Sequence, residues 1–317
     1  IHPSTNEPKN IKTYPLEWLP KSISKLVLYF TTSLTEHTHY LCAPSESTST
    51  SNELGYFPTS LTHLELDNAH MSLEVVKQIP SSVTVLSTHG LHSILCQNLP
   101  PRLLELDSVN TAGNSDFMKN LPKSLVKLTV RFADPDQKTF FSPFVELSRL
   151  TPVEAIPGYA PEKSFQGMWS VATCFSNLQY LNIDASVIGL GDLFSCNQFL
   201  RLEELIISSS DTLDAKQISC FPQSLKTLSL QRCTCPEGLI KLLPRGITNL
   251  SLTRTGEVYD ADIRDLPPNL KRLALLGSKN MLTDTCIKDL PKSLQDASFY
   301  ACDFSQKIIP DLPPIIR

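Results

Sequence analysis

A proline-led phrase, seen as LPKSLVKLTV at residues 121–130, recurs along almost the whole chain. Ten copies align on their proline, and most successive prolines are 20–24 residues apart: Pro20, Pro58, Pro80, Pro100, Pro122, Pro222, Pro244, Pro267, Pro291 and Pro313. Two further copies, FSNLQYLNI from Phe175 and FLRLEELII from Phe199, keep the pattern without the proline. A period of this length is typical of a solenoid, in which each repeat is one supersecondary unit.

Apolar residues occupy the third, sixth and eighth positions after the proline, as in Leu225, Leu228 and Leu230. The last two alternate with polar residues, which indicates a short strand with one buried face. Proline lacks the N–H that a strand paired on both sides needs, so its fixed place before the strand marks the corner where the chain enters a sheet.

One repeat is too small to fold alone. It offers four or five apolar side chains worth roughly 1.5–3 kcal/mol each when buried, whereas ordering its residues costs about 1–2 kcal/mol apiece. Stacked repeats bury both flanks of each unit. The sequence therefore predicts an α/β repeat solenoid with a parallel sheet on its concave face. The return segments at 71–80 and 283–291 are short and end at a proline, which predicts single helical or 3₁₀ turns on the convex face.

The pattern LxxLxL followed by a small residue resembles the leucine-rich repeat superfamily, and the leading LPxSL is similar to FNIP-type and bacterial-effector repeats. The resemblance implies a horseshoe and covers the chain from about Leu19 to its end. Residues 1–18 are expected to be an N-terminal cap, and 19–317 an array of about 11 full repeats plus the start of a twelfth. The small closing residues, such as Ser210, Cys233 and Thr255, stand where the family usually has Asn or Cys.

Two interruptions are expected to be loops, near 31–54 and at 133–173. The first is rich in Ser and Thr. The second carries aromatic residues, and long loops on a solenoid are often functional. We therefore expect Phe144, Tyr159 and Trp169 in the second loop to contact a partner.

Composition narrows the classes of partner and site. The net charge of −4 and the lack of a Lys/Arg run argue against nucleic acid. No stretch approaches the roughly 18 apolar residues of a membrane span. Nine cysteines form no closely spaced framework, which favours reduced thiols and a cytoplasmic protein. No catalytic or phosphate-binding motif is recognised. We expect no enzymatic activity, cofactor or metal site.

Side chains five, seven and nine residues after the proline are expected to face the concave side. The predicted partner-binding residues are His63, Glu65, Asp67, His89, Glu105, Asp107, Lys127, Arg131, Tyr180 and Asp184. The four carboxylates at positions 65, 67, 105 and 107 suggest docking of a basic segment, because like charges on neighbouring strands repel until a partner arrives. The alternative is a solvated sheet face.

Three functions are compatible with these patterns. The first is a non-catalytic module that binds a protein or peptide on its concave face and the 133–173 loop. The second, implied by the resemblance, is the substrate-recognition part of a larger enzyme such as a ubiquitin ligase. The third is an extracellular ligand-binding ectodomain.

Overall fold

The computed structural model describes residues 19–29, 40–41, 57–71, 73–89, 91, 93–111, 117–132, 175–184, 199–210, 213–277, 281–300, 302 and 304–305. The expected cap at 1–18, the expected loop at 133–173 and the start of the twelfth repeat at Pro313 lie outside these residues. The expected loop near 31–54 also lies outside them, apart from a two-residue strand, β2 (Tyr40–Leu41).

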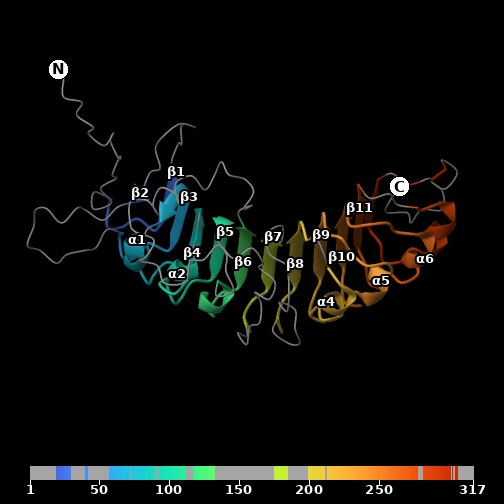
Figure 1. The fold of residues 1–317 in the computed structure, drawn as a ribbon, viewed down its shortest axis with the longest axis horizontal. Coiled ribbons are helices and arrows are strands. Elements are labelled where there is room, and N and C mark those ends of the chain that lie inside the picture. The colour runs from blue at the N-terminus through green and yellow to red at the C-terminus, as the bar shows by residue number, and fades with distance from the viewer. Residues whose placement is uncertain are drawn as a thin grey trace, which may run out of the picture.

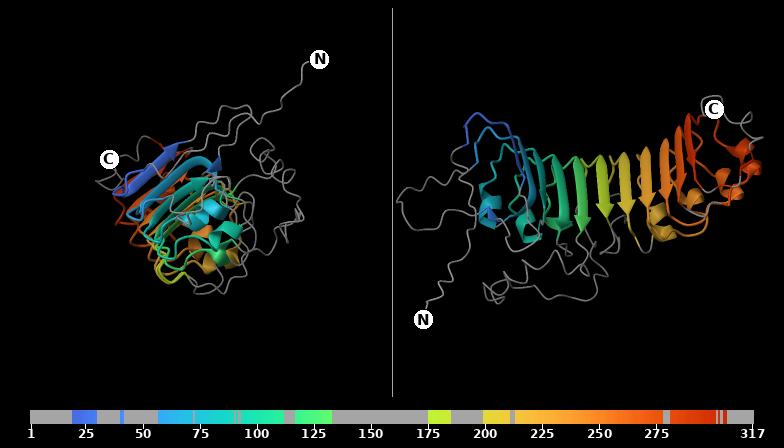
Figure 2. Two further views of the ribbon diagram at one scale, coloured as in Figure 1. Left: turned by 90° about the vertical axis from the view of Figure 1, so that its left-hand side faces the viewer. Right: turned by 90° about the horizontal axis from the view of Figure 1, so that it is seen from above.

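Within the described residues, twelve strands form one sheet, and every pairing is parallel. Eleven follow one another in chain order, whereas β2 pairs only with β3. These eleven are β1 (Lys25–Tyr29), β3 (His63–Met71), β4 (Val85–His89), β5 (Glu105–Thr111), β6 (Lys127–Phe132), β7 (Tyr180–Asp184), β8 (Glu204–Ser208), β9 (Thr227–Gln231), β10 (Asn249–Thr253), β11 (Arg272–Leu276) and β12 (Asp296–Phe299). Figure 2 shows them side by side, pointing the same way.

Short helices follow several of the strands and lie on the outer side of the curved array, whereas the sheet lines its inner side (Figure 1). They are α1 (Leu73–Gln78), α2 (Ser93–Cys96), η2 (Met118–Asn120), α4 (Ala215–Ser219), α5 (Leu239–Leu242), α6 (Asp260–Ile263) and η4 (Asp284–Asp289). Both return segments for which a helical turn is expected contain one, α1 and η4. The predicted repeat solenoid is therefore confirmed. Within the described part of the chain, no helix has the length and apolar character to cross a membrane.

The core lies between the sheet and the helices, and the strand residues alternate between it and the concave face. Leu228 and Leu230 of β9 are fully buried, as are Leu205 and Ile207 of β8. Their register is in phase, with Leu205 opposite Leu228. Two repeats depart from the apolar pattern, because Thr88 and Ser108 fill the eighth position and are also buried.

The corner before each strand is a turn closed on the proline carbonyl. The backbone N–H of Leu225 donates to the carbonyl of Pro222 at 3.1 Å, and Leu61 repeats this with Pro58 at 3.0 Å. The same bond forms on Phe175, one of the two residues that stand in place of the proline, where the Leu178 N–H donates at 3.2 Å. The predicted corner thus forms with or without the proline.

The small residues that close the repeats of β8, β9 and β10 are buried. Ser210 and Thr255 are almost inaccessible, and Cys233 is 2% exposed. The Cys233 thiol lies 3.5 Å from the Ile207 carbonyl and 3.4 Å from that of Gln231. Burial, the largest influence, raises the pKa of this thiol. Cys233 is therefore a packing residue held as a neutral thiol.

Candidate functional site

The ten predicted partner-binding residues on strands all lie in β3 to β7, which are consecutive in the sheet. We call the concave side of these five strands the β3–β7 face. Parallel register places its side chains in three rows that run across the strands. Asp67 of β3 lies opposite Tyr29 of β1 in the register of the sheet. The predicted loop residues Phe144, Tyr159 and Trp169 lie outside the described residues.

The first row joins Glu105, Lys127 and Tyr180 on neighbouring strands. The Lys127 Nζ lies 3.7 Å from the Glu105 Oε2, and both side chains are about half exposed. The same ammonium lies 5.3 Å from the centre of the Tyr180 ring, within the range of a cation–π contact. Lys127 therefore offsets the charge of Glu105. In the same row, His63 Nδ1 lies 2.8 Å from the Thr62 hydroxyl.

The middle row contains two carboxylates, those of Glu65 and Asp107. Glu65 of β3 lies opposite Ser87 of β4, and Ser87 lies opposite Asp107 of β5. Neither carboxylate makes an ion pair with any residue that the structure describes. The Asp107 Oδ1 is also buried and has no hydrogen-bond partner there. A buried polar atom without a partner costs free energy, which a donor from a bound ligand would recover.

The third row is mixed in charge. Arg131 of β6 is opposite Asp184 of β7, and His89 of β4 is opposite Val109 of β5. Arg131 is exposed, whereas His89 and Asp184 are partly buried. The β3–β7 face thus combines a neutralised first row, an acidic middle row and an edge that carries both charges.

This arrangement suits reversible binding through charge and an aromatic side chain. Tyrosine is enriched among interface residues. Among the described residues, no group of three or more His, Cys, Asp or Glu side chains converges to hold a metal ion. What the β3–β7 face can offer is a set of acceptors for Lys and Arg side chains, with Tyr180 as a partly buried apolar contact.

Sequence reasoning missed a second surface feature, two adjoining pockets beside the ends of β9 and β10. Arg232 and Arg254 line one of them, and Glu237 and Glu257 line the other. A signal was present in the sequence. Both arginines stand at the tenth position after their proline, immediately beyond the three concave positions.

Comparison with solved structures finds proteins of similar fold. An internalin from Listeria monocytogenes matches with 11% identity and a TM-score of 0.47, over 94% of this chain and 86% of the internalin. The leucine-rich repeat-containing protein LegL7 from Legionella pneumophila matches with 16% identity and a TM-score of 0.41, over 92% and 87%. TLR13, in a complex with ssRNA13, matches with 19% identity and a TM-score of 0.49, and the aligned region spans 80% of this chain but 33% of TLR13.

No family model matches the sequence, and neither does any curated protein. At such identities and TM-scores, the likeness to solved structures carries no argument about function. The leucine-rich-repeat architecture rests on the repeats of this chain and on its single parallel sheet.

Proposed function

We propose that this chain is a non-catalytic binding module that holds a basic segment of a protein or peptide on the β3–β7 face. The observation that carries the proposal lies in the middle row: among the described residues, Glu65 and Asp107 have no ion-pair partner and one oxygen of Asp107 has no donor. Lys or Arg side chains of a partner would supply both the charge and the hydrogen bonds.

The spacing of the strands supports an extended ligand. Glu65 and Asp107 are two strands apart, which corresponds to roughly 10 Å. Two basic residues separated by two or three positions in an extended peptide span a similar distance. Glu105, already offset by Lys127, would contribute to specificity more than to net attraction.

A peptide library displayed on phage provides the test. Peptides selected on the wild-type chain should be enriched in Lys and Arg. Their affinity for a Glu65→Lys/Asp107→Lys variant should fall by about tenfold or more, because each reversed charge replaces attraction with repulsion. Rising salt should weaken binding to the wild-type chain, since partly exposed charges are screened.

A matched control is available on other surfaces of the array. Glu203 is exposed just before β8, and Asp265 lies on the convex side, where its carboxylate forms an exposed ion pair with Lys241 at 3.7 Å. The Glu203→Lys/Asp265→Lys variant changes the net charge equally and should bind the selected peptides like the wild type. Equal loss in both variants, or no loss in the first, would refute the proposal.

A further inference from the structure

The residue that follows the strand has a left-handed backbone in four consecutive repeats. Ser209, Arg232, Arg254 and Gly277 have φ of 57°, 51°, 53° and 69° and come directly after β8, β9, β10 and β11. The N–H of Arg232 donates to the Thr253 carbonyl at 2.7 Å, and that of Arg254 to the Leu276 carbonyl at 2.8 Å. Strand-to-strand bonding in the repeats therefore holds both arginines in this conformation.

Two arginines at this position are unfavourable for the fold alone. A left-handed backbone is strained for any residue with a Cβ. The two cations also follow neighbouring parallel strands, which lie about 4.8 Å apart, so they repel each other. Neither guanidinium makes an ion pair or hydrogen bond with the residues that the structure describes. Strain and unpaired like charge on adjacent repeats suggest a functional role.

Both arginines line one pocket of about 280 Å³, together with the turn from Cys233 to Cys235 and with Thr255 and Gly256. The lining contains no carboxylate. The Thr234 side chain is exposed and makes no hydrogen bond with described residues. Two guanidinium forks and a free hydroxyl are donors that match the three oxygens of a phosphoryl group, whose charge near −2 would neutralise both arginines.

The adjoining pocket, of about 260 Å³, has the opposite charge and shares Cys235, Thr255 and Gly256 with the first. Glu237, Glu257 and Asp262 line it. The Tyr259 hydroxyl donates to the Glu257 carboxylate, and the Tyr259 N–H donates to Asp262 at 2.9 Å. The Glu237 carboxylate makes no such bond with described residues, so it stays available to a cation. An anionic membrane or nucleic acid would be repelled by this second pocket.

We propose that the two pockets together bind a phosphorylated peptide, with the phosphoryl group on Arg232 and Arg254 and a neighbouring Lys or Arg side chain on Glu237. This site is separate from the β3–β7 face, and its test does not depend on the function proposed for that face.

The test is fluorescence polarisation, at low ionic strength, with a synthetic peptide that carries phosphoserine and a lysine two residues later. The wild-type chain should bind it at least about tenfold more tightly than the unphosphorylated peptide, because charge-assisted hydrogen bonds are lost with the phosphate. The Arg232→Gln/Arg254→Gln variant should lose this preference. A Glu237→Gln variant should weaken binding of the lysine peptide but not of a matched peptide with alanine in place of lysine.

The control is Arg201→Gln/Lys226→Gln, which removes two exposed cations elsewhere on the array and should leave phosphopeptide binding unchanged. Equal affinity for the phosphorylated and unphosphorylated peptides would overturn the proposal, as would equal loss in the control variant. Binding to vesicles of phosphatidylserine that depends on Arg232 and Arg254, without binding of the phosphopeptide, would also overturn it.

Discussion

The Ser224 hydroxyl donates a hydrogen bond of 2.8 Å to the carbonyl of Leu202, in the preceding repeat. The same bond joins Ser82 to Leu61 at 2.7 Å and Ser124 to Leu103 at 2.6 Å. Each serine is the second residue after its proline. The serine of the repeated phrase therefore ties one repeat to its neighbour at the corner where the sheet begins.

Replacing Ser224 with alanine should lower the free energy of unfolding by about 1 kcal/mol, because a partly buried carbonyl loses its donor. The matched change is Ser229→Ala on the concave face, where the hydroxyl's one bond with described residues is an exposed one, accepted from the Gln231 side chain at 3.2 Å. That change should stay within about 0.5 kcal/mol. Urea unfolding measures both, and equal effects would contradict a special role for the corner serine.

Two glycines with left-handed backbones allow the cost of backbone strain to be measured apart from the cost of a steric contact. A Cβ at Gly238 (φ 70°) would meet nothing within 4 Å, whereas a Cβ at Gly277 (φ 69°) would lie 3.0 Å from Arg254 Cγ. Gly238→Ala should therefore cost about 1 kcal/mol from backbone strain alone. Gly277→Ala should cost more, and thermal unfolding of both variants checks the order. An equal cost at Gly277 would show that the Arg254 side chain moves away freely, and a smaller cost would contradict the expected order.

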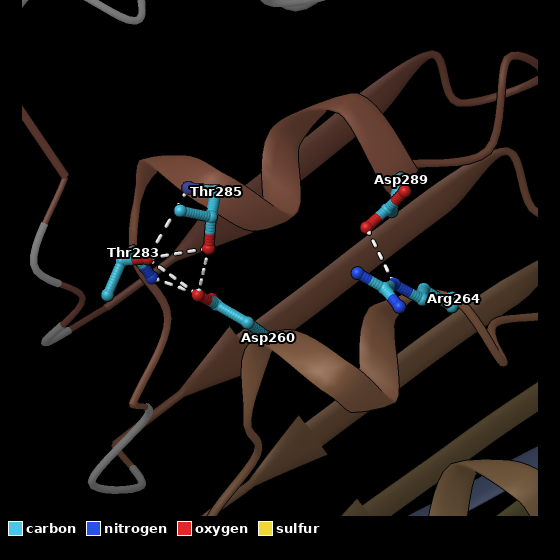
Figure 3. Close-up of polar contacts among 5 residues, drawn as sticks. All are labelled: Asp260, Arg264, Thr283, Thr285 and Asp289. Carbon is cyan, nitrogen blue, oxygen red and sulfur yellow. Dashed lines mark hydrogen bonds and ion pairs between the residues drawn. The ribbon is translucent and has the colours of Figure 1, made fainter.

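Asp260 links α6 to the next repeat (Figure 3). Its carboxylate accepts hydrogen bonds from the Thr283 N–H at 2.8 Å, from the Thr283 hydroxyl at 2.6 Å and from the Thr285 hydroxyl. Burial favours the neutral acid, but the bonds from Thr283 and Thr285 together outweigh it and lower the pKa of Asp260 below its usual 3.8. The charged form is thus the one that stabilises the fold.

Because the folded-state pKa is the lower one, the stabilisation by Asp260 is present above the unfolded pKa and is lost as the pH falls through the folded value. The difference in unfolding free energy between wild type and Asp260→Asn should be largest at neutral pH and should shrink below about pH 4. Urea titrations across this range measure it. A difference that grows on acidification would contradict the assigned direction.

Much of the fold could be predicted from the sequence because the same pattern of apolar residues recurs in each repeat. Leu225, Leu228 and Leu230 illustrate core positions that are buried as expected. The position of the proline also predicts which charged side chains face the concave side, since side chains alternate strictly along a strand. A single repeat would be ambiguous, and the recurrence removes the ambiguity.

Other features depend on contacts between repeats, which the pattern of one repeat does not encode. The alignment on the proline places Glu105 and Lys127 in one row, but their contact depends on the conformations of the two side chains. No apolar alternation in the sequence indicates the two-residue strand β2 or the register shift between Leu66 and His70 of β3. The left-handed arginines were missed because position ten holds several residue types.

Carbodiimide labelling of carboxylates, with and without a basic peptide selected on the wild-type chain, tests most directly whether the β3–β7 face is the binding surface. Labelling at each residue is read by mass spectrometry. Bound peptide should protect Glu65 and Glu105 from modification and leave Glu203 and Asp265 as reactive as before. Protection of Glu203 or Asp265, with Glu65 and Glu105 still fully reactive, would contradict the assignment.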